Sequence, residues 1–164
     1  MIAVPMAQLL TIPIMLDSAE ISGRLRFDPA RAGFDSLDGL IELAERLICA
    51  RAVYDVAYIG AKGEGTVEIA DVTFRSSILR ANLDGANKVF PYIITVGPEL
   101  ERAAAAQGDL LKQYYLEEMA NYALEQAATW LRKKLEARYG MGALSNMSPG
   151  SLEYWQITEQ TKLY

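Results

Sequence analysis

Hydrophobic and polar positions along the chain follow two different periods, and each period predicts one kind of element. Apolar residues recur three and four positions apart from Leu37 to about Ala50, and again over the longer stretch from Leu110 to Tyr139. This spacing places them on one face of a helix. Residues 52–60 and 65–74 instead alternate between apolar and polar positions, on either side of a glycine-rich segment. We therefore predict two main helices and a β-hairpin.

Shorter elements are predicted from the same pattern and from the positions of serine and proline. Residues 8–28 are expected to be extended, because an apolar run there passes into alternation. A short helix is expected to begin at residues 76–77, since a serine hydroxyl accepts hydrogen bonds from the first N–H groups of a helix. Residues 88–97 are predicted to form an edge strand, because Pro91 has no N–H to donate. Pro98 then suits the start of another helix.

The long helix predicted over residues 110–139 carries a stripe of small and branched side chains, namely Leu116, Ala120, Ala123, Leu124, Ala127, Trp130, Leu131 and Leu135. This stripe predicts that the helix is buried along most of its length, and Gly140 is a suitable stop. Helices and strands follow one another without regular βαβ alternation. The predicted fold class is therefore α+β, with a small antiparallel or mixed sheet packed against helices. We expect one module over residues 1–164, in which 1–36 form an extended lead-in and 37–164 the main body.

Composition and charge narrow the range of partners. The 164 residues are 51% hydrophobic and 23% charged, which is typical of a globular domain. The net charge of −5 argues against nucleic acid or an anionic membrane as a partner, because both attract basic surfaces. The first sixteen residues are uncharged, but they lack a basic start, contain Pro5 and Pro13, and are too short to span a bilayer. We expect no membrane role.

The absence of histidine and the single cysteine, Cys49, exclude several classes of enzyme. Ser-His-Asp and Cys-His catalysis need an imidazole base, and ordinary zinc sites and iron–sulfur clusters need His or several Cys ligands. No Asp-x-Asp-x-Asp loop is present, so no metal site is expected. Cys49 lies in an apolar helical pattern, which predicts a buried thiol that reacts slowly in the native protein. A single cysteine forms no disulfide within the chain, which favours a reducing, cytoplasmic setting.

Three short stretches are candidates for binding a ligand. Gly60–Gly65 matches no phosphate-loop spacing and is interpreted as a hairpin turn. At Gly97-Pro98 a predicted strand meets a predicted helix, so N–H groups there could face an anion or the edge of a cofactor, although a plain turn is the favoured interpretation. Glu125 lies on a polar strip of the long helix. A solvated face explains it best, yet its small neighbours leave room for an amine or a ribose hydroxyl.

A fourth candidate is the turn near the end of the chain. Ser148-Pro149-Gly150 has the residue pattern of a type II turn, with Pro at the second position and Gly at the third. The N–H groups that follow Gly150 are candidates to bind a carboxylate or phosphate, and Tyr154 and Trp155 are candidates to stack on a flat ring or a cation. The alternative is that both rings only cover the end of the long helix. The residues alone leave both interpretations open.

Four segments, in this order, resemble the activation domain of cobalamin-dependent methionine synthase and its stand-alone relatives: DVTFRSSILRANL (71–83), KVFPYIITVGPELE (88–101), GDLLKQYYLEEMANYALEQAA (108–128) and NMSPGSLEYWQITEQ (146–160). The similarity runs from about residue 37 to the end of the chain, and its most specific part is the Ser-Pro-Gly turn followed by a Trp and a Gln. The resemblance implies further strands beyond Tyr164, so we expect the chain to be a shortened form or a fragment of that domain.

In that family the turn belongs to an Arg-x-x-x-Gly-Tyr motif that holds S-adenosylmethionine, which the domain presents to cobalamin during reductive reactivation. Here Gly150 keeps its place, while Asn146 stands where Arg is expected and Ser151 where Tyr is expected. A neutral amide does not replace the charge of a guanidinium on the donor's carboxylate. The residues expected to contact the ligand are Asn146, Ser148, Pro149, Gly150, Ser151, Gly97 and Glu125.

The resemblance implies an accessory module that serves a corrinoid methyltransferase, with S-adenosylmethionine or a related ligand on this chain and cobalamin on a partner protein. The chain itself would supply no catalytic residue, because the chemistry belongs to cobalamin. A second hypothesis is a non-catalytic adaptor that docks on a corrinoid protein and has lost the donor site. A third is a separate small-molecule enzyme that uses carboxylates such as Glu125, for which no acid–base pair is visible in the sequence.

Overall fold

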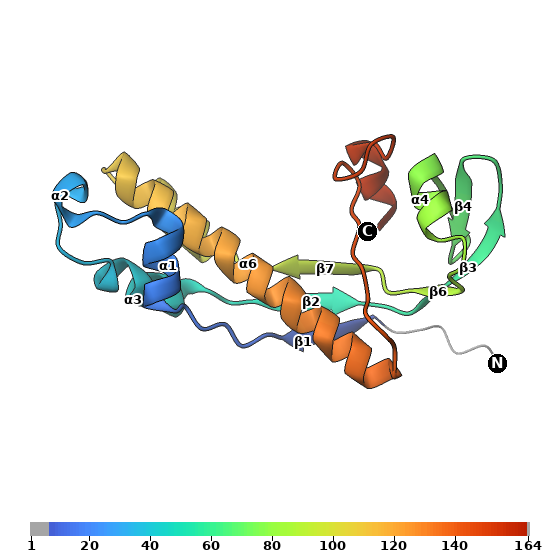
Figure 1. Ribbon diagram of the computed structural model, residues 1–164, viewed down its shortest axis with the longest axis horizontal. Coiled ribbons are helices and arrows are strands. Elements are labelled where there is room, and N and C mark those ends of the chain that lie inside the picture. Colours follow the sequence, from blue (N-terminus) through green and yellow to red (C-terminus); the bar gives the residue numbers. More distant parts are fainter. Residues whose placement is uncertain (1–6, 164) are drawn as a thin grey trace. The chain divides into compact units, whose positions relative to one another are not determined.

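The computed structural model describes residues 7–163, and it confirms the α+β class (Figure 1). In chain order the elements are β1 (Gln8–Thr11), α1 (Ser18–Leu25), α2 (Pro29–Ala32), α3 (Asp38–Leu47), β2 (Arg51–Tyr54), β3 (Ala57–Lys62), β4 (Thr66–Ile69), β5 (Val72–Arg75), α4 (Ser77–Asn82), β6 (Lys88–Val89), β7 (Tyr92–Thr95), α5 (Glu99–Ala105), α6 (Leu110–Tyr139) and the 3-10 helix η1 (Ile157–Leu163).

The chain divides into two compact units, each made of separate stretches of sequence. The helical unit comprises residues 9–52 and 94–141, and the hairpin unit comprises residues 53–93 and 142–163 together with residues 7–8. Two small sheets are present in the described residues. One has the strand order β1-β2-β7, and the other is antiparallel with the order β5-β4-β3-β6. The chain passes from one unit to the other within β2 and again within β7.

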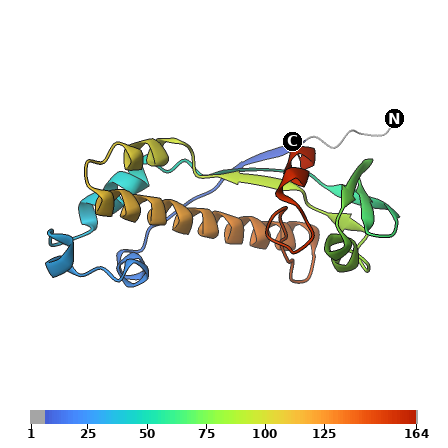
Figure 2. The same ribbon diagram turned by 90° about the horizontal axis from the view of Figure 1, so that it is seen from above.

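The helical unit is built around the N-terminal half of α6. Helices α3 and α5 both pack against this half, and Figure 2 shows them beside its first turns. Leu100 of α5 and Leu116 of α6 are fully buried in the resulting core. Next to this core the rings of Phe27, Phe34 and Tyr115 meet with centroids 5.5–6.2 Å apart, a distance at which aromatic pairs attract each other.

The predicted long helix is confirmed from Leu110 to Tyr139. Asp109 accepts hydrogen bonds from the first N–H groups of α6, and Gly140 ends it in the left-handed conformation with φ 59°. Ala123 and Ala127 are both 0% exposed, as their place in the stripe predicts. The prediction that Leu124 belongs to the buried stripe is wrong, because its side chain is 40% exposed. It follows Ala123 by one residue, about 100° around the helix, and so turns away from the core.

The hairpin unit contains the predicted β-hairpin and a second one that the alternation concealed. β3 and β4 pair on either side of the glycine-rich segment, as predicted, but residues 52–60 are not one strand, because they are divided between β2, which belongs to the other sheet, and β3. Residues 65–74, however, do not form one strand: β4 and β5 pair around Ala70 and Asp71, which have φ values of 48° and 64°. Two successive residues with positive φ make the turn that suits the twist of a two-stranded ribbon. Alanine is an unusual residue at such a position, so the residue pattern did not indicate this turn.

Two further expectations are corrected near residues 8–28 and 88–97. Residues 18–25 are not extended but form α1, where Asp17 accepts a hydrogen bond from the Glu20 N–H and Ile21 is buried. Residues 88–97 are not one strand, because the chain leaves the ladder at Phe90-Pro91 and each half lies at the edge of a different sheet. The edge position agrees with the missing N–H of proline.

The core of the hairpin unit lies between its sheet, α4 and the C-terminal segment, with Val67, Phe74, Leu79, Leu83 and Trp155 buried together. Ser76 caps α4, as predicted, by accepting a hydrogen bond from the Leu79 N–H. Lys62 of β3 binds the segment that follows α4. Its ammonium group donates to the carbonyl oxygens of Leu83, Asp84 and Ala86 at 2.6–3.2 Å. This one cation binds three carbonyl groups, of which that of Leu83 also accepts from the Ala86 N–H at 3.1 Å.

Cys49 is not buried, and the prediction of a core thiol is wrong. Helix α3 ends at Leu47, and Ile48 is already extended, so Cys49 lies in the link to β2 and is solvent-exposed. Its backbone N–H donates to the carbonyl oxygen of Val96 at 2.8 Å. Because of this backbone pairing, residues 48–50 do not continue the helix that the pattern of side chains predicted.

Ala123→Leu should destabilise the protein by about 1–3 kcal/mol, because three extra carbon atoms enter a fully packed site. Ala137→Leu is the matched control, since Ala137 lies on the exposed side of the same helix and should change the free energy of unfolding little. Urea unfolding followed by circular dichroism measures both. Equal stability of the two variants would contradict the close packing of α6.

The exposed position of Cys49 gives a second expectation. Native protein should react with a thiol-specific reagent at a rate close to that of the urea-unfolded chain, because the sulfur is already open to solvent. Stopped-flow labelling with and without urea measures the two rates. A native rate slower by a hundredfold or more would show that the thiol is shielded after all.

Candidate functional site

The turn at residues 148–151 closes on itself through its own hydrogen bonds. The Ser151 N–H donates to the Ser148 carbonyl oxygen at 3.1 Å, and the Ser151 hydroxyl donates to the same oxygen at 2.7 Å. The Ser148 N–H in turn donates to the Ser151 Oγ at 3.1 Å. The Gly150 N–H donates to the Trp155 carbonyl oxygen at 2.8 Å. The turn is therefore rigid, and its N–H groups at 148, 150 and 151 already have acceptors.

Gly150 is required by the geometry of this turn. Its φ is 83°, a conformation that side chains disfavour, and an added Cβ would lie 2.9 Å from the Cδ1 of Ile157. Pro149 is buried beside it. Asn146, by contrast, is solvent-exposed, so the position at which the resemblance expects an arginine has room for a longer side chain.

The two aromatic residues after the turn have different surroundings. Trp155 is 6% exposed and meets Phe74 edge to face at 6.4 Å, so it belongs to the core of the hairpin unit. Its indole N–H is buried and finds no acceptor among residues 7–163. Tyr154 is 73% exposed and has a φ of 62°, which is uncommon for a bulky residue. Tyr154 is thus the ring that is open to a ligand or partner.

The C-terminal helix η1 fixes the turn by binding the edge of the sheet at β5. The Glu159 carboxylate accepts a hydrogen bond from the Arg75 N–H at 3.0 Å and pairs with Lys162 at 2.7 Å. Lys162 also donates to the Thr73 carbonyl oxygen at 2.9 Å. Burial would raise the pKa of Glu159, but the bonds from Lys162 and Arg75 outweigh it and hold the pKa below its ordinary value of 4.5.

Gly97 lies in the helical unit, and packing explains its presence. Its φ is 86°, and an added Cβ would meet the backbone and Cβ of Cys49 at 3.4–3.7 Å. Its N–H donates to the Thr95 hydroxyl at 3.0 Å. The helix that follows, α5, is only seven residues long. These contacts account for the glycine as a close-packed turn and leave its N–H with an acceptor.

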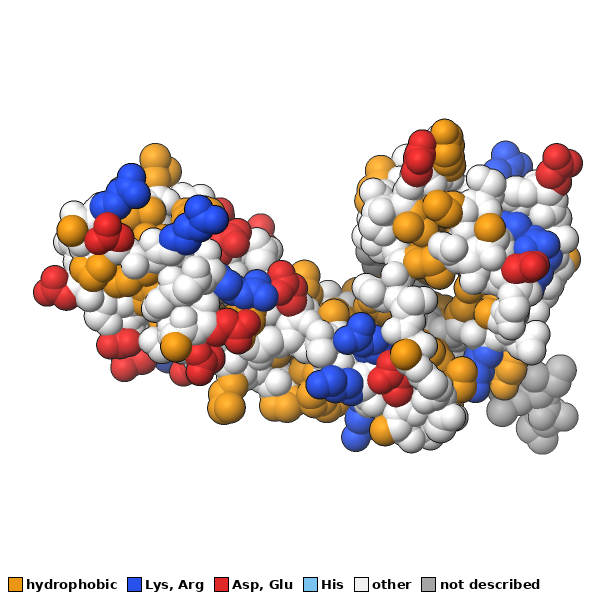
Figure 3. Space-filling model, in the orientation of Figure 1, with side chains coloured by type: hydrophobic (Ala, Val, Ile, Leu, Met, Phe, Trp, Pro, Cys, Tyr) orange, Lys and Arg blue, Asp and Glu red, His pale blue; other side chains and the backbone are white. Residues whose placement is uncertain are grey.

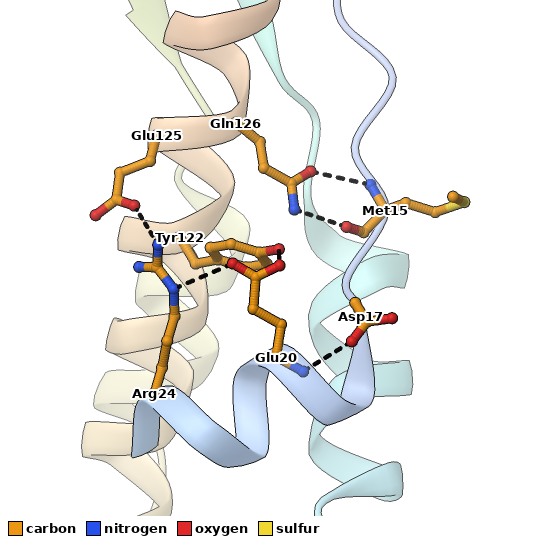
Figure 4. A network of polar contacts seen from close by, with 7 residues as sticks. All are labelled: Met15, Asp17, Glu20, Arg24, Tyr122, Glu125 and Gln126. Carbon is orange, nitrogen blue, oxygen red and sulfur yellow. Dashed lines mark hydrogen bonds and ion pairs between the residues drawn. The ribbon is translucent and has the colours of Figure 1, made fainter. Parts of the chain in front are cut away.

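Glu125 lies on α6 and takes part in a polar cluster with α1, the helix that the sequence did not predict (Figure 4). Its Oε2 accepts a hydrogen bond from Arg24 at 2.7 Å. The Arg24 guanidinium stands over the Tyr122 ring, 4.5 Å from its centroid, and its Nε lies 3.6 Å from Glu20. The Tyr122 hydroxyl donates to Glu20 at 2.5 Å. The hydrogen bond to Glu20, together with burial, raises the pKa of Tyr122 above its ordinary value of 10.

A second set of contacts extends the cluster toward the lead-in. The Gln126 side chain donates to the Met15 carbonyl oxygen at 2.8 Å and accepts from the Met15 N–H at 3.4 Å (Figure 4). Beside these residues an open groove of about 410 Å³ runs along α6. Its walls are formed by Pro13, Glu20, Arg24, Tyr122, Glu125, Gln126, Thr129, Trp130 and Lys133.

The predicted site residues divide between the two units. Asn146 and the turn Ser148–Ser151 belong to the hairpin unit, whereas Gly97 and Glu125 belong to the helical unit. Sequence reasoning found Glu125 but missed Arg24 and Glu20, its partners in the cluster. The one available signal was Asp17, a good N-cap for a helix that would place Glu20 and Arg24 four residues apart on one side.

The sequence matches no protein-family model and no curated protein. Among residues 7–163 no three His, Cys, Asp or Glu side chains gather closely enough to hold a metal ion. Over the same residues no helix combines the length and the apolar character needed to cross a membrane.

The lowered pKa of Glu159 predicts a pH dependence of stability. Because its pKa is lower in the folded than in the unfolded chain, its stabilisation is present above about pH 4.5 and is lost as the pH falls through the folded value. Glu159→Gln should lower the free energy of unfolding by about 1 kcal/mol at pH 7 and by less at pH 3.

Urea unfolding of the hairpin unit, followed by Trp155 fluorescence in a Trp130→Phe background, measures this difference. Glu153→Gln, an exposed carboxylate on the same segment, is the control and should have no effect at either pH. A loss that is equal at pH 3 and pH 7 would show that the charge of Glu159 is not the cause.

Proposed function

We propose that this chain is an activation-domain-like module that binds S-adenosylmethionine or a related ligand and supports the reductive activation of a corrinoid on a partner protein in the cytoplasm. The order of the four resembling segments supports this assignment. The observation that carries it is the turn at residues 148–151, which is held in one conformation by its own hydrogen bonds. A preformed turn binds a ligand without a cost for ordering the loop.

The residues present fit the sulfonium end of such a donor better than its carboxylate end. The exposed ring of Tyr154 offers a face to a cation. Neither the N–H groups of Gly150 and Ser151, which have internal acceptors, nor the neutral Asn146 provides a strong partner for a carboxylate. Bound cobalamin on the partner would carry out the methyl and electron transfer, and this chain would position the donor. We expect binding in the millimolar range.

A second candidate function is the adaptor that docks on a corrinoid protein without holding a donor. The satisfied N–H groups of the turn favour it, because they leave little for a small anion to bind. The exposed side chains of Tyr154 and Ile157 lie next to the turn and suit contact with a protein surface.

Asn146→Arg should tighten the binding of S-adenosylmethionine about tenfold, because a guanidinium adds a charge-assisted contact to the donor's carboxylate. Isothermal titration of the wild type and the variant measures both dissociation constants. Ser145→Arg is the matched control: it adds the same charge at the adjacent exposed position and should change the affinity much less.

Three outcomes separate the candidates. Tightening by Asn146→Arg alone supports donor binding at the turn. Equal tightening by both arginine variants would show that the effect comes from the added positive charge in general and not from a specific contact at position 146. No binding by any form, combined with co-elution of the chain with a cobalamin-loaded corrinoid protein, would favour the adaptor.

A further inference from the structure

The groove beside the Arg24–Glu125 cluster has features that the function proposed above does not use. Glu125, Thr129, Trp130 and Lys133 follow one another along one side of α6 and line the groove together. Glu125, Thr129 and Lys133 are spaced four residues apart and form one row along the helix, and Trp130 lies beside that row, three residues before Lys133. The volume of about 410 Å³ lies in the range of small-molecule sites.

Other residues that line the groove are already held in place. Arg24 is held by Glu125, Glu20 and the Tyr122 ring, and Gln126 is held by both polar groups of the Met15 backbone (Figure 4). Side chains that are bonded to one another lose little further freedom when a ligand arrives. The groove is therefore preorganised on one side.

Three groups along α6 remain open to a ligand. The second carboxylate oxygen of Glu125, Oε1, accepts no hydrogen bond within residues 7–163, and in Figure 4 it points away from Arg24. The ring of Trp130 is partly exposed at the groove, and one of its faces already meets the Lys134 ammonium at 5.8 Å from the ring centroid, so a base has the other face to stack on. Lys133 is exposed and forms no ion pair in the described part of the chain. Figure 3 shows Lys and Arg side chains over the C-terminal part of α6.

We propose that this groove binds a nucleoside phosphate whose base carries an exocyclic amine. The order of groups on α6 follows the order of groups in such a ligand. The free Glu125 oxygen accepts a hydrogen bond from the amine, Trp130 stacks on the base, and Lys133 pairs with the phosphate. Glu125 and Lys133 are separated by about 12 Å along the helix axis at 1.5 Å per residue, which suits a mononucleotide in an extended form.

The carboxylate gives the site a specific preference. A base with a carbonyl oxygen in place of the amine would direct that oxygen at Glu125, and two acceptors facing each other leave both without a donor. The site should therefore prefer adenine or cytosine nucleotides to hypoxanthine or uracil nucleotides. Removal of the phosphate should weaken binding separately, because Lys133 would lose its partner.

Titration of the full chain with AMP, IMP, adenosine and inorganic phosphate tests the proposal by calorimetry and by quenching of tryptophan fluorescence. We expect AMP to bind, and IMP and adenosine each to bind at least about tenfold more weakly. Only part of the quenching of tryptophan fluorescence should be lost in Trp130→Phe. The affinity for AMP should fall about tenfold in Trp130→Ala. Absence of AMP binding, or equal affinity for AMP and IMP, would overturn the proposal.

Variants of two neighbouring cations supply the matched control. Lys133→Gln should lower the affinity for AMP to that for adenosine and leave adenosine binding unchanged. Arg132→Gln removes the same charge from an exposed residue that does not line the groove, so AMP affinity should stay close to that of the wild type. Equal losses in both variants would indicate non-specific attraction and would overturn the assignment to Lys133.

The proposed nucleotide site in the groove and the proposed donor site at the turn use different residues. Asn146→Arg should leave AMP binding unchanged. S-adenosylmethionine should displace AMP only as weakly as adenosine does, because it shares the adenosine part and lacks the phosphate. Failure of AMP to bind would contradict the nucleotide site and would not affect the proposal for the turn. Failure of S-adenosylmethionine to bind would contradict the donor site and would not affect the proposal for the groove. Displacement of AMP by S-adenosylmethionine at much lower concentrations than adenosine requires would show that one site serves both ligands and would contradict a separate nucleotide groove.

Discussion

Burial of α6 is the constraint on which the helical unit depends. Most of the stability of a helix in a protein comes from the packing of one of its faces, and here α3, α5 and α1 all pack against α6. Alanine at positions 123 and 127 permits close approach, and neither side chain retains any exposed surface. The same requirement explains why α1 exists at all. Its buried Ile21 joins the α6 core and makes a helix of eight residues stable in a place where the local pattern predicts extended chain.

The polar cluster between α1 and α6 determines geometry more than stability. Arg24, Glu20 and Glu125 are each about half exposed, and ion pairs between exposed side chains contribute little to folding. The cluster holds several side chains in one arrangement along the groove. One of them is Tyr122, whose hydroxyl binds Glu20 and whose ring lies under Arg24. The groove therefore has a rigid wall on the α1 side, while Thr129, Trp130 and Lys133 on α6 stay open to solvent.

The sequence predicted the elements that are long or marked by a strong local signal. The 30-residue α6, the Ser76 cap and the β3–β4 hairpin were all found, because each depends on residues close in sequence. The second hairpin was missed, since Ala70-Asp71 lacks the glycine that normally announces such a turn. Within the candidate site, Glu125 was identified, but Arg24 is 101 residues away, and a local pattern contains no information on such a pairing. Cys49 was misplaced for the same reason, because its pairing with Val96 is a tertiary contact.

The turn at residues 148–151 shows how rigidity limits what a site can recognise. The hydrogen bonds that hold it also consume its N–H groups, so a ligand there must be recognised by side chains rather than by backbone. Trp155 contributes to the same outcome, since its carbonyl oxygen binds Gly150 while its ring is buried against Phe74. The exposed side chains of Asn146, Ser148, Ser151 and Tyr154 carry no charge, and the exposed Glu153 next to them is itself an anion. Recognition of an anionic group at this turn therefore depends on the residue at position 146, and an asparagine there makes it weak.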